Sequence, residues 1–258
     1  MTIAVRVGEP RRLVSLVPSI TETLFEWGVT PVGVTRFCDI TGRGDLSTPA
    51  HDHSPGAPTI AVVGGTKNPD IEAIVALEPD AVLMDREENR RPDADALEAA
   101  GVTVVATAVR SLGDVDDALA VLGEAAGLAY ERDRAPSDSA HSTGGRTRVF
   151  VPIWRRPWMT VSEDTYAGSL LEAVGLVNVF ATEDERYPTV ELAQATQGRA
   201  EVVLAPSEPY AFTERHRPEL ETVAPVVFVD GRDLFWWGVR TPKALQRLDA
   251  LARSITAR

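Results

Sequence analysis

Cysteine is nearly absent from the sequence, which has a single one, Cys38, in 258 residues. One thiol cannot form an intrachain disulfide, so the fold does not depend on an oxidising compartment. Long apolar runs are missing too, and without roughly 18 consecutive apolar residues we expect no membrane span. The first residues lack the basic region and the unbroken apolar stretch of a signal peptide. The chain as it stands is therefore expected to be cytoplasmic, or extracytoplasmic if a leader has been removed.

Positive charge is in deficit, because 38 acidic residues outweigh 26 Lys and Arg and give a net charge of -12. Nucleic-acid binding requires a basic face, so we expect no nucleic-acid partner. Enzyme motifs are missing as well: there is no G-x-S-x-G nucleophile elbow, no G-x-G-x-x-G after the first strand and no G-x-x-x-x-G-K-[ST] phosphate loop. We predict that the protein is not an enzyme and has no catalytic residues.

A metal site has only a weak signal. His51 and His53 form an H-x-H in a Gly/Pro/Ser-rich loop, 42–58, and histidine is a zinc ligand. Histidines in such a loop are more often solvated than ligating, so we predict no metal site.

Short apolar runs alternate with amphipathic stretches, which is the α/β pattern. The strand-like runs lie at 12–17, 31–35, 81–85, 102–108, 148–154, 178–181, 201–206 and 225–230. The helical patterns lie at 20–28, 69–79, 93–101, 112–127, 167–175, 189–196 and 217–223. The pattern stops at 131–147, which has almost no apolar side chains and cannot bury a face.

This interruption predicts two domains. We expect an N-terminal α/β lobe with the start of a connecting helix over 1–127, a polar linker over 128–147 and a C-terminal α/β lobe over 148–258.

The two halves are weak copies of each other. Residues 21–35 parallel 167–182, residues 71–85 parallel 190–206, and residues 96–106 parallel 220–230. Helix-to-strand units resemble one another in general, but the same order in both halves favours two similar lobes. Two such lobes form a cleft where loops from the carboxyl ends of strands converge.

Four of the five tryptophans lie in two short stretches, WRRPW at 154–158 and DLFWW at 233–237. Each stretch follows a predicted strand, so both are expected at carboxyl ends. Their rings could stack on a bulky ligand while Arg155 and Asp233 meet its polar rim. The alternative is that these tryptophans close the core between the lobes.

At this point the chain resembles a known family. The segments at 12–39, 64–83, 166–180 and 230–242 are similar to the helical-backbone (class III) substrate-binding proteins of ABC importers, especially their cobalamin-binding branch. The resemblance covers nearly the whole chain outside 128–147, and it implies two Rossmann-like lobes with a ligand cleft between them. The same fold carries cobalamin, siderophores, haem and bare metals.

The resemblance also implies site residues. Phe37 falls at an aromatic position of the first lobe, Trp158 and Tyr187 at aromatic positions of the second, and Asp233 at an acidic one. Trp154, Arg155, Trp236 and Trp237 are adjacent in the sequence and are expected to join them. A corrinoid fits such a site, because its flat apolar faces favour rings and its amide rim favours hydrogen-bonding groups.

Two further features concern the importer. Family members dock on the permease through one exposed Glu from each lobe. Glu72 matches the first, whereas Ala193 stands at the second place, with Glu191 close by. The family also joins its lobes by a long helix; residues 112–130 supply about five turns before the polar stretch, so we expect a shortened connection.

Three functions stay open at this point. The favoured one is a binding protein for a corrinoid or a similar metal chelate, with no covalent cofactor and with an ABC permease as a partner. The first alternative is an intracellular enzyme or carrier for a metal-containing or planar cofactor. The second is a receptor for a siderophore, haem or a metal ion.

Overall fold

The computed structural model describes residues 4–6, 8, 11–41, 45–47, 59–131 and 146–256. The chain divides into two compact units. Unit 1 comprises Met1–Val109, Asp114–Asp133 and Trp237–Val239. Unit 2 comprises Arg110–Gly113, Arg134–Trp236 and Arg240–Arg258.

Unit 1 contains a six-stranded parallel sheet in the order β4-β5-β3-β2-β8-β9. Its strands are β2 (Leu13–Ser15), β3 (Gly33–Val34), β4 (Asp45–Ser47), β5 (Thr59–Val62), β8 (Ala81–Asp85) and β9 (Val104–Thr107). Every residue of β8 is buried, as expected for a parallel strand covered on both faces.

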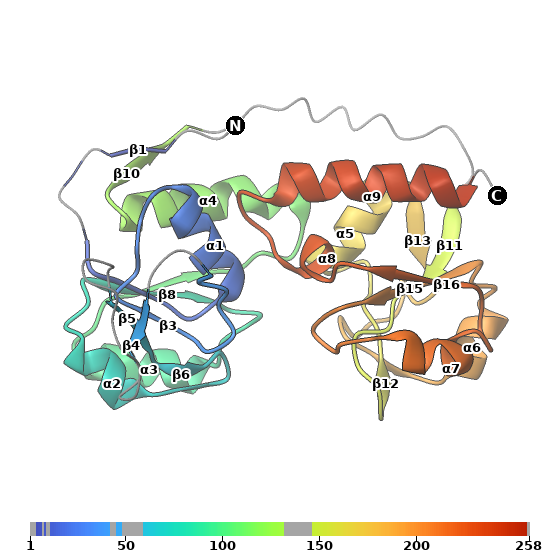
Figure 1. Ribbon diagram of the computed structural model, residues 1–258, viewed down its shortest axis with the longest axis horizontal. Coiled ribbons are helices and arrows are strands. Elements are labelled where there is room, and N and C mark those ends of the chain that lie inside the picture. The colour runs from blue at the N-terminus through green and yellow to red at the C-terminus, as the bar shows by residue number, and fades with distance from the viewer. Residues whose placement is uncertain are drawn as a thin grey trace. The chain divides into compact units, whose positions relative to one another are not determined.

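Helices cover both faces of this sheet, with α1 and α4 on one side and α2 and α3 on the other (Figure 1). Their bounds are α1 (Pro18–Glu26), α2 (Ile71–Ala76), α3 (Arg91–Ala99) and α4 (Val115–Ala125). Ile74 of α2 and Leu97 of α3 pack with Val82 of β8 in one buried cluster. Phe25 of α1 packs with Ile60 of β5 in another.

The entry to α2 follows a tight hairpin of β6 (Gly64–Gly65) and β7 (Asn68–Pro69). Gly64 has a φ of 88°, which favours glycine. The Asp70 carboxylate then accepts a hydrogen bond from the Ala73 backbone N–H at 3.0 Å and caps the helix.

The predicted connection between the lobes needs correction. The helix preceding it, α4, ends at Ala125 instead of continuing toward residue 130. Gly127 stops it with a φ of 68°, and Leu128–Tyr130 form β10, which pairs antiparallel with β1 (Ala4–Arg6). The first three residues of the predicted linker are therefore a strand, and residues 132–145 lie outside the described part of the chain.

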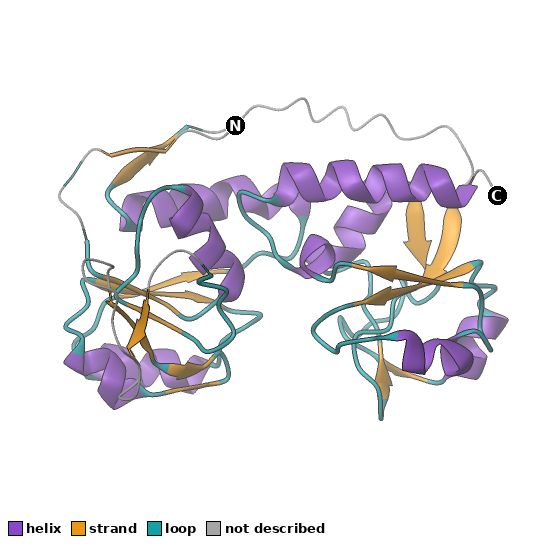
Figure 2. Ribbon diagram, in the orientation of Figure 1, coloured by secondary structure: helices purple, strands orange, loops and turns teal. Residues whose placement is uncertain are grey.

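Unit 2 contains a four-stranded parallel sheet in the order β13-β11-β15-β16. Its strands are β11 (Thr147–Phe150), β13 (Leu176–Asn178), β15 (Val202–Pro206) and β16 (Val226–Val229), and a separate antiparallel pair is formed by β12 (Trp158–Met159) and β14 (Thr189–Val190). The helices are α5 (Tyr166–Ala173), α6 (Leu192–Gln197), α7 (Arg217–Leu220), α8 (Arg232–Phe235) and α9 (Thr241–Thr256). Figure 2 shows α5 and α9 on one side of the sheet and α6 and α7 on the other.

The internal repeat is confirmed by the topology of the two sheets. Unit 1 contains the strand order β3-β2-β8-β9, and unit 2 has the corresponding order β13-β11-β15-β16. The paralleled segments match element by element, because α2 leads into β8 as α6 leads into β15. The α/β fold class with two similar lobes follows.

Helix α9 was not among the predicted helices. It buries Ala244, Leu248 and Ala252, which are spaced by four residues and so share one face. Short 3₁₀ turns occur at η1 (Leu112–Asp114) and η2 (Glu214–His216). Among the described residues, none of the helices has the length and apolar character needed to cross a bilayer.

Candidate ligand-binding site

Three loops at the carboxyl edge of the unit 2 sheet carry aromatic side chains. Trp154 and Trp158 follow β11, Tyr210 and Phe212 follow β15, and Trp236 follows β16. In a parallel sheet these loops leave the same edge, which is where ligands bind in α/β folds. The predicted placement of both tryptophan-rich stretches at carboxyl ends is confirmed.

A hairpin turn presents the first two rings. Trp154 and Met159 form a β-bridge, in which the Met159 N–H donates to the Trp154 carbonyl at 3.2 Å. Trp158 pairs with Val190 of β14, which ties the hairpin to the rest of the unit. Trp154 remains 45% exposed, and such an exposed indole is available to a ligand.

We call Trp154, Trp158, Tyr210, Phe212 and His216 the aromatic wall. Trp154 meets Tyr210 edge to face, with centroids 5.5 Å apart, and Tyr210 packs on Phe212 at 4.8 Å. Phe212 stacks on Trp158 at 6.0 Å with 8° between the planes. His216 contacts both Tyr210 and Phe212 at 5.5 Å. Phe212 and His216 are buried, so the wall extends from a buried base to an exposed tryptophan.

Arg155, which lies between the two tryptophans of the hairpin, is already paired. Its Nε donates to the Glu219 carboxylate at 2.8 Å, and Nη2 lies 2.8 Å from the same oxygen. The guanidinium is therefore committed to a contact between the hairpin and α7.

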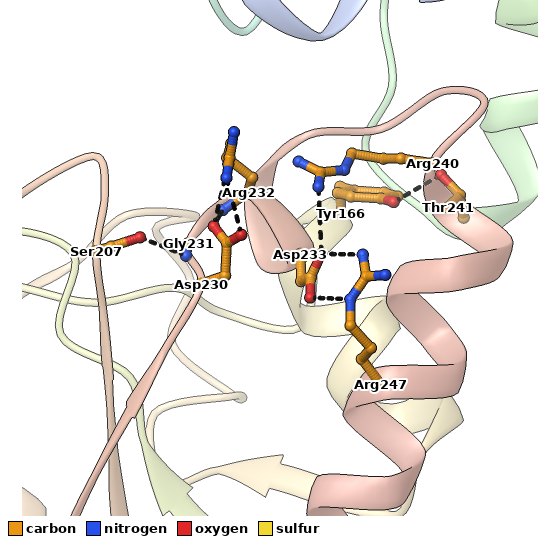
Figure 3. A network of polar contacts seen from close by, with 9 residues as sticks. All are labelled: Tyr166, Ser207, Asp230, Gly231, Arg232, Asp233, Arg240, Thr241 and Arg247. Carbon is orange, nitrogen blue, oxygen red and sulfur yellow. Dashed lines mark hydrogen bonds and ion pairs between the residues drawn. The ribbon is translucent and has the colours of Figure 1, made fainter. Parts of the chain in front are cut away.

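Asp233, predicted as an acidic ligand contact, is buried in unit 2 and already paired with arginine. It is 6% exposed, and both carboxylate oxygens accept hydrogen bonds from Arg247, from Nε at 2.6 Å and from Nη2 at 2.5 Å (Figure 3). Arg240 approaches the same carboxylate at 3.5 Å. The acid thus anchors α8 to α9.

The remaining predicted rings differ in environment. Trp236 is half-buried, and the guanidiniums of Arg232 and Arg240 lie over its ring at 5.8 and 5.5 Å. Trp237 is 4% exposed and belongs to unit 1, which does not support the predicted ligand contact. Tyr187 is 40% exposed in the loop before β14.

Unit 1 presents one exposed aromatic ring at the carboxyl end of β3. Phe37 is 57% exposed, and the Arg36 guanidinium lies 5.0 Å from its centroid. Thr35 Oγ1 accepts a hydrogen bond from the Phe37 N–H at 3.3 Å, which fixes the turn. The predicted ring of the first lobe therefore lies on a loop that can contact a ligand.

The comparison with family models decides what kind of protein presents these rings. Residues 13–205 match the family described as periplasmic binding protein. The chain belongs to that family. It is a binding protein rather than an enzyme, as the missing motifs predicted.

Individual relatives agree with this membership. The vitamin B12-binding protein of Salmonella paratyphi A is 24% identical over 213 residues, covering 79% of this chain and 75% of that protein. The structure of the periplasmic vitamin B12 binding protein of Vibrio cholerae superimposes with a TM-score of 0.69 at 16% identity, covering 96% of this chain and 99% of that one. A periplasmic heme-binding protein from Roseiflexus sp. RS-1 gives 0.70 at 18% identity, with the same coverage.

The two candidate docking positions are equivalent in their helices. Glu72 is exposed two residues after Asp70, the N-cap of α2. Ala193 is exposed two residues after Glu191, the N-cap of α6. The backbone N–H of Glu191 donates to the Gln194 amide oxygen at 2.7 Å. Ala193 therefore holds the place of Glu72, and exposed Glu191 lies at the start of its helix.

No metal site was predicted from the sequence. The described part of the chain holds no group of three His, Cys, Asp or Glu side chains able to bind a metal ion, and His51 and His53 lie outside it.

Sequence reasoning missed Tyr210, Phe212 and His216. Their one signal was the aromatic pair in the loop after the strand at 201–206.

Proposed function

We propose that this chain is the substrate-binding protein of an ABC importer, acting outside the cytoplasmic membrane on a planar metal chelate. A corrinoid such as cobalamin is the favoured ligand. The observation that carries the proposal is the aromatic wall, whose outer ring, Trp154, is 45% exposed and held edge-on by Tyr210. The relatives named vitamin B12-binding proteins support the same ligand.

The charged pair next to Trp154 favours a ligand with an uncharged rim. Arg155 is paired with the Glu219 carboxylate. A guanidinium that is held by an acidic neighbour attracts a ligand carboxylate only weakly, because the ion pair has no net charge. Amide groups like those of a corrinoid need only hydrogen-bonding partners.

Haem is the second candidate. The heme-binding protein from Roseiflexus superimposes as well as the vitamin B12 binding protein does. Tyr187 is exposed in unit 2, and a tyrosine phenol is one of the side chains that ligate haem iron in proteins.

Calorimetric titration with cyanocobalamin and, separately, with haemin tests the ligand. We expect saturable one-to-one binding of cyanocobalamin with a Kd of about 1 μM or tighter, which corresponds to about -8 kcal/mol. Binding of haemin alone would replace the corrinoid by the second candidate. No binding of either compound would refute a planar chelate as the ligand.

We further propose that Glu72 and Glu191 contact the permease. Uptake of labelled cyanocobalamin should be lost in cells that produce Glu72→Lys, while the Kd of the purified variant stays unchanged. Glu124→Lys is the matched control, because it makes the same charge change on α4, on the other face of the sheet (Figure 1). Equal uptake by the two variants would refute the docking role.

A further inference from the structure

His216 is buried at the base of the aromatic wall, in the turn η2 that leads into α7. Both ring nitrogens face N–H donors: the Thr213 backbone N–H donates to Nδ1 at 3.0 Å, and the Arg215 Nε lies 3.1 Å from Nε2. A neutral imidazole accepts through one nitrogen, whereas a protonated ring accepts through neither. The surroundings therefore fit a neutral ring.

Burial and the charges around the ring favour the neutral form on balance. Burial opposes a positive charge on His216, and so do the guanidiniums of Arg215 and Arg155, whereas the Glu219 carboxylate favours it. The balance lowers the pKa of His216 below the ordinary histidine value.

Two routes connect this histidine to the exposed tryptophan. The first is direct, because Tyr210 contacts His216 on one side and Trp154 on the other, with its hydroxyl 3.4 Å from Nε2. The second follows the chain. The bond from the Thr213 N–H closes the turn before α7, and α7 carries Glu219, which holds Arg155 next to Trp154.

We propose that His216 is a positioning residue of the aromatic wall, and that protonation of its ring loosens Tyr210 and Glu219 and weakens ligand binding in acid. The neutral ring turns its single N–H toward one of the two donors, the Thr213 N–H or the Arg215 Nε–H, and protonation sets a second ring N–H against the other. Because the pKa of His216 is lowered, binding is complete above the ordinary histidine range and is lost as the pH falls through the lowered value. The proposal rests on the proposed function, since the wall is the surface assigned to the ligand.

His216→Asn is the decisive variant. The carboxamide oxygen of Asn can accept the Thr213 N–H in place of Nδ1, and the amide cannot take up a proton. We expect the Kd of the wild type for cyanocobalamin to be about tenfold higher one pH unit below the measured midpoint of the His216 titration than at about pH 7.5. The variant should bind within about threefold of the wild type at the higher pH and show no comparable rise. The same acid weakening in both proteins would overturn the proposal.

A ligand-free measurement separates this proposal from the proposed function. In ¹⁵N spectra, the ring of His216 should be neutral at neutral pH and should titrate below the ordinary histidine value. The indole N–H signal of Trp154 should move with the same midpoint, and it should stay fixed in His216→Asn. If neither ligand binds but these signals behave as expected, the positioning role stands and the ligand proposal fails. If the Trp154 indole signal does not shift as His216 titrates, the positioning role is refuted even where the ligand binds.

Discussion

Trp158 stacks on Phe212, with the ring centroids 6.0 Å apart and the planes 8° from parallel. Phe212 belongs to the buried core of unit 2, and Trp158 packs against that core. Trp154, four residues earlier, rests on Tyr210 by its edge and is 45% exposed. One hairpin therefore presents two tryptophans with different tasks, one that supports the core and one that meets solvent.

Alanine variants of these two tryptophans should separate the tasks. Trp154→Ala should weaken cyanocobalamin binding by about 1–2 kcal/mol, with a stability loss below about 1 kcal/mol. Trp158→Ala should lower the free energy of unfolding by about 2–3 kcal/mol, because it removes a ring packed on the core. Urea unfolding and calorimetry measure the two effects. Equal stability losses in both variants would contradict this assignment.

The sequence predicted the layers of the fold because burial leaves a clear pattern. The first four residues of β8 are apolar, and the fifth, Asp85, ends the strand. The same helix-to-strand units recur in the four-stranded sheet of unit 2. Helix α9 was missed since its buried positions include Ala244 and Ala252, whose small side chains contrast weakly with polar neighbours.

The site was predicted only in part, because its members support one another across long stretches of chain. The ring of Trp158 could be placed at a carboxyl end from the sequence, but its partner Phe212 lies 54 residues later. The acid at Asp233 has the residue type that a ligand site could use. Only the tertiary structure shows that Arg247 on α9 occupies its carboxylate.

Asp233→Asn should lower the stability of unit 2, and we do not expect it to remove a ligand contact. The substitution removes the charge that Arg247 and Arg240 share, at a side chain that is 9% exposed. Because Arg247 is half-exposed, we expect a loss of about 2 kcal/mol rather than the roughly 3–5 kcal/mol of a fully buried pair. Asp249→Asn, which breaks an exposed pair with Arg253 on α9, is the control and should cost below about 0.5 kcal/mol. Similar urea midpoints for the two variants would show that Asp233 is not an anchor.

Glu208 should make stability depend on pH. Burial and the nearby Asp230 carboxylate raise the pKa of Glu208. Its side chain also forms a hydrogen bond with the side chain of Trp236. A raised carboxyl pKa favours the protonated form in the folded state, so the free energy of unfolding falls as the pH rises through the ordinary glutamate value toward the raised one. The penalty is complete once the pH exceeds the raised value.

Glu208→Gln keeps an acceptor for the indole and removes the charge. The variant should therefore unfold at a higher urea concentration than the wild type at about pH 7, and the two should converge near pH 4. Glu124→Gln, an exposed substitution on α4, controls for the general loss of a negative charge. A Glu208→Gln variant that is less stable at neutral pH would show that its ionised form stabilises the fold.

Gly231 couples the loops that follow β15 and β16. Its N–H donates to Ser207 Oγ at 3.0 Å, and a Cβ at this position would lie 2.4 Å from the Glu208 carbonyl oxygen and 2.6 Å from the Glu208 backbone nitrogen. Backbone atoms cannot yield as a side-chain tip can, so Gly231→Ala should lower the free energy of unfolding by about 3 kcal/mol or more. Gly113→Ala is the matched control, since its Cβ would meet only Ser111 Oγ at 3.5 Å, and it should change stability by less than about 0.5 kcal/mol. If Gly231→Ala unfolds at the wild-type urea midpoint, the two loops can separate at little cost, and the close approach of their backbones does not hold the carboxyl edge of the sheet in place.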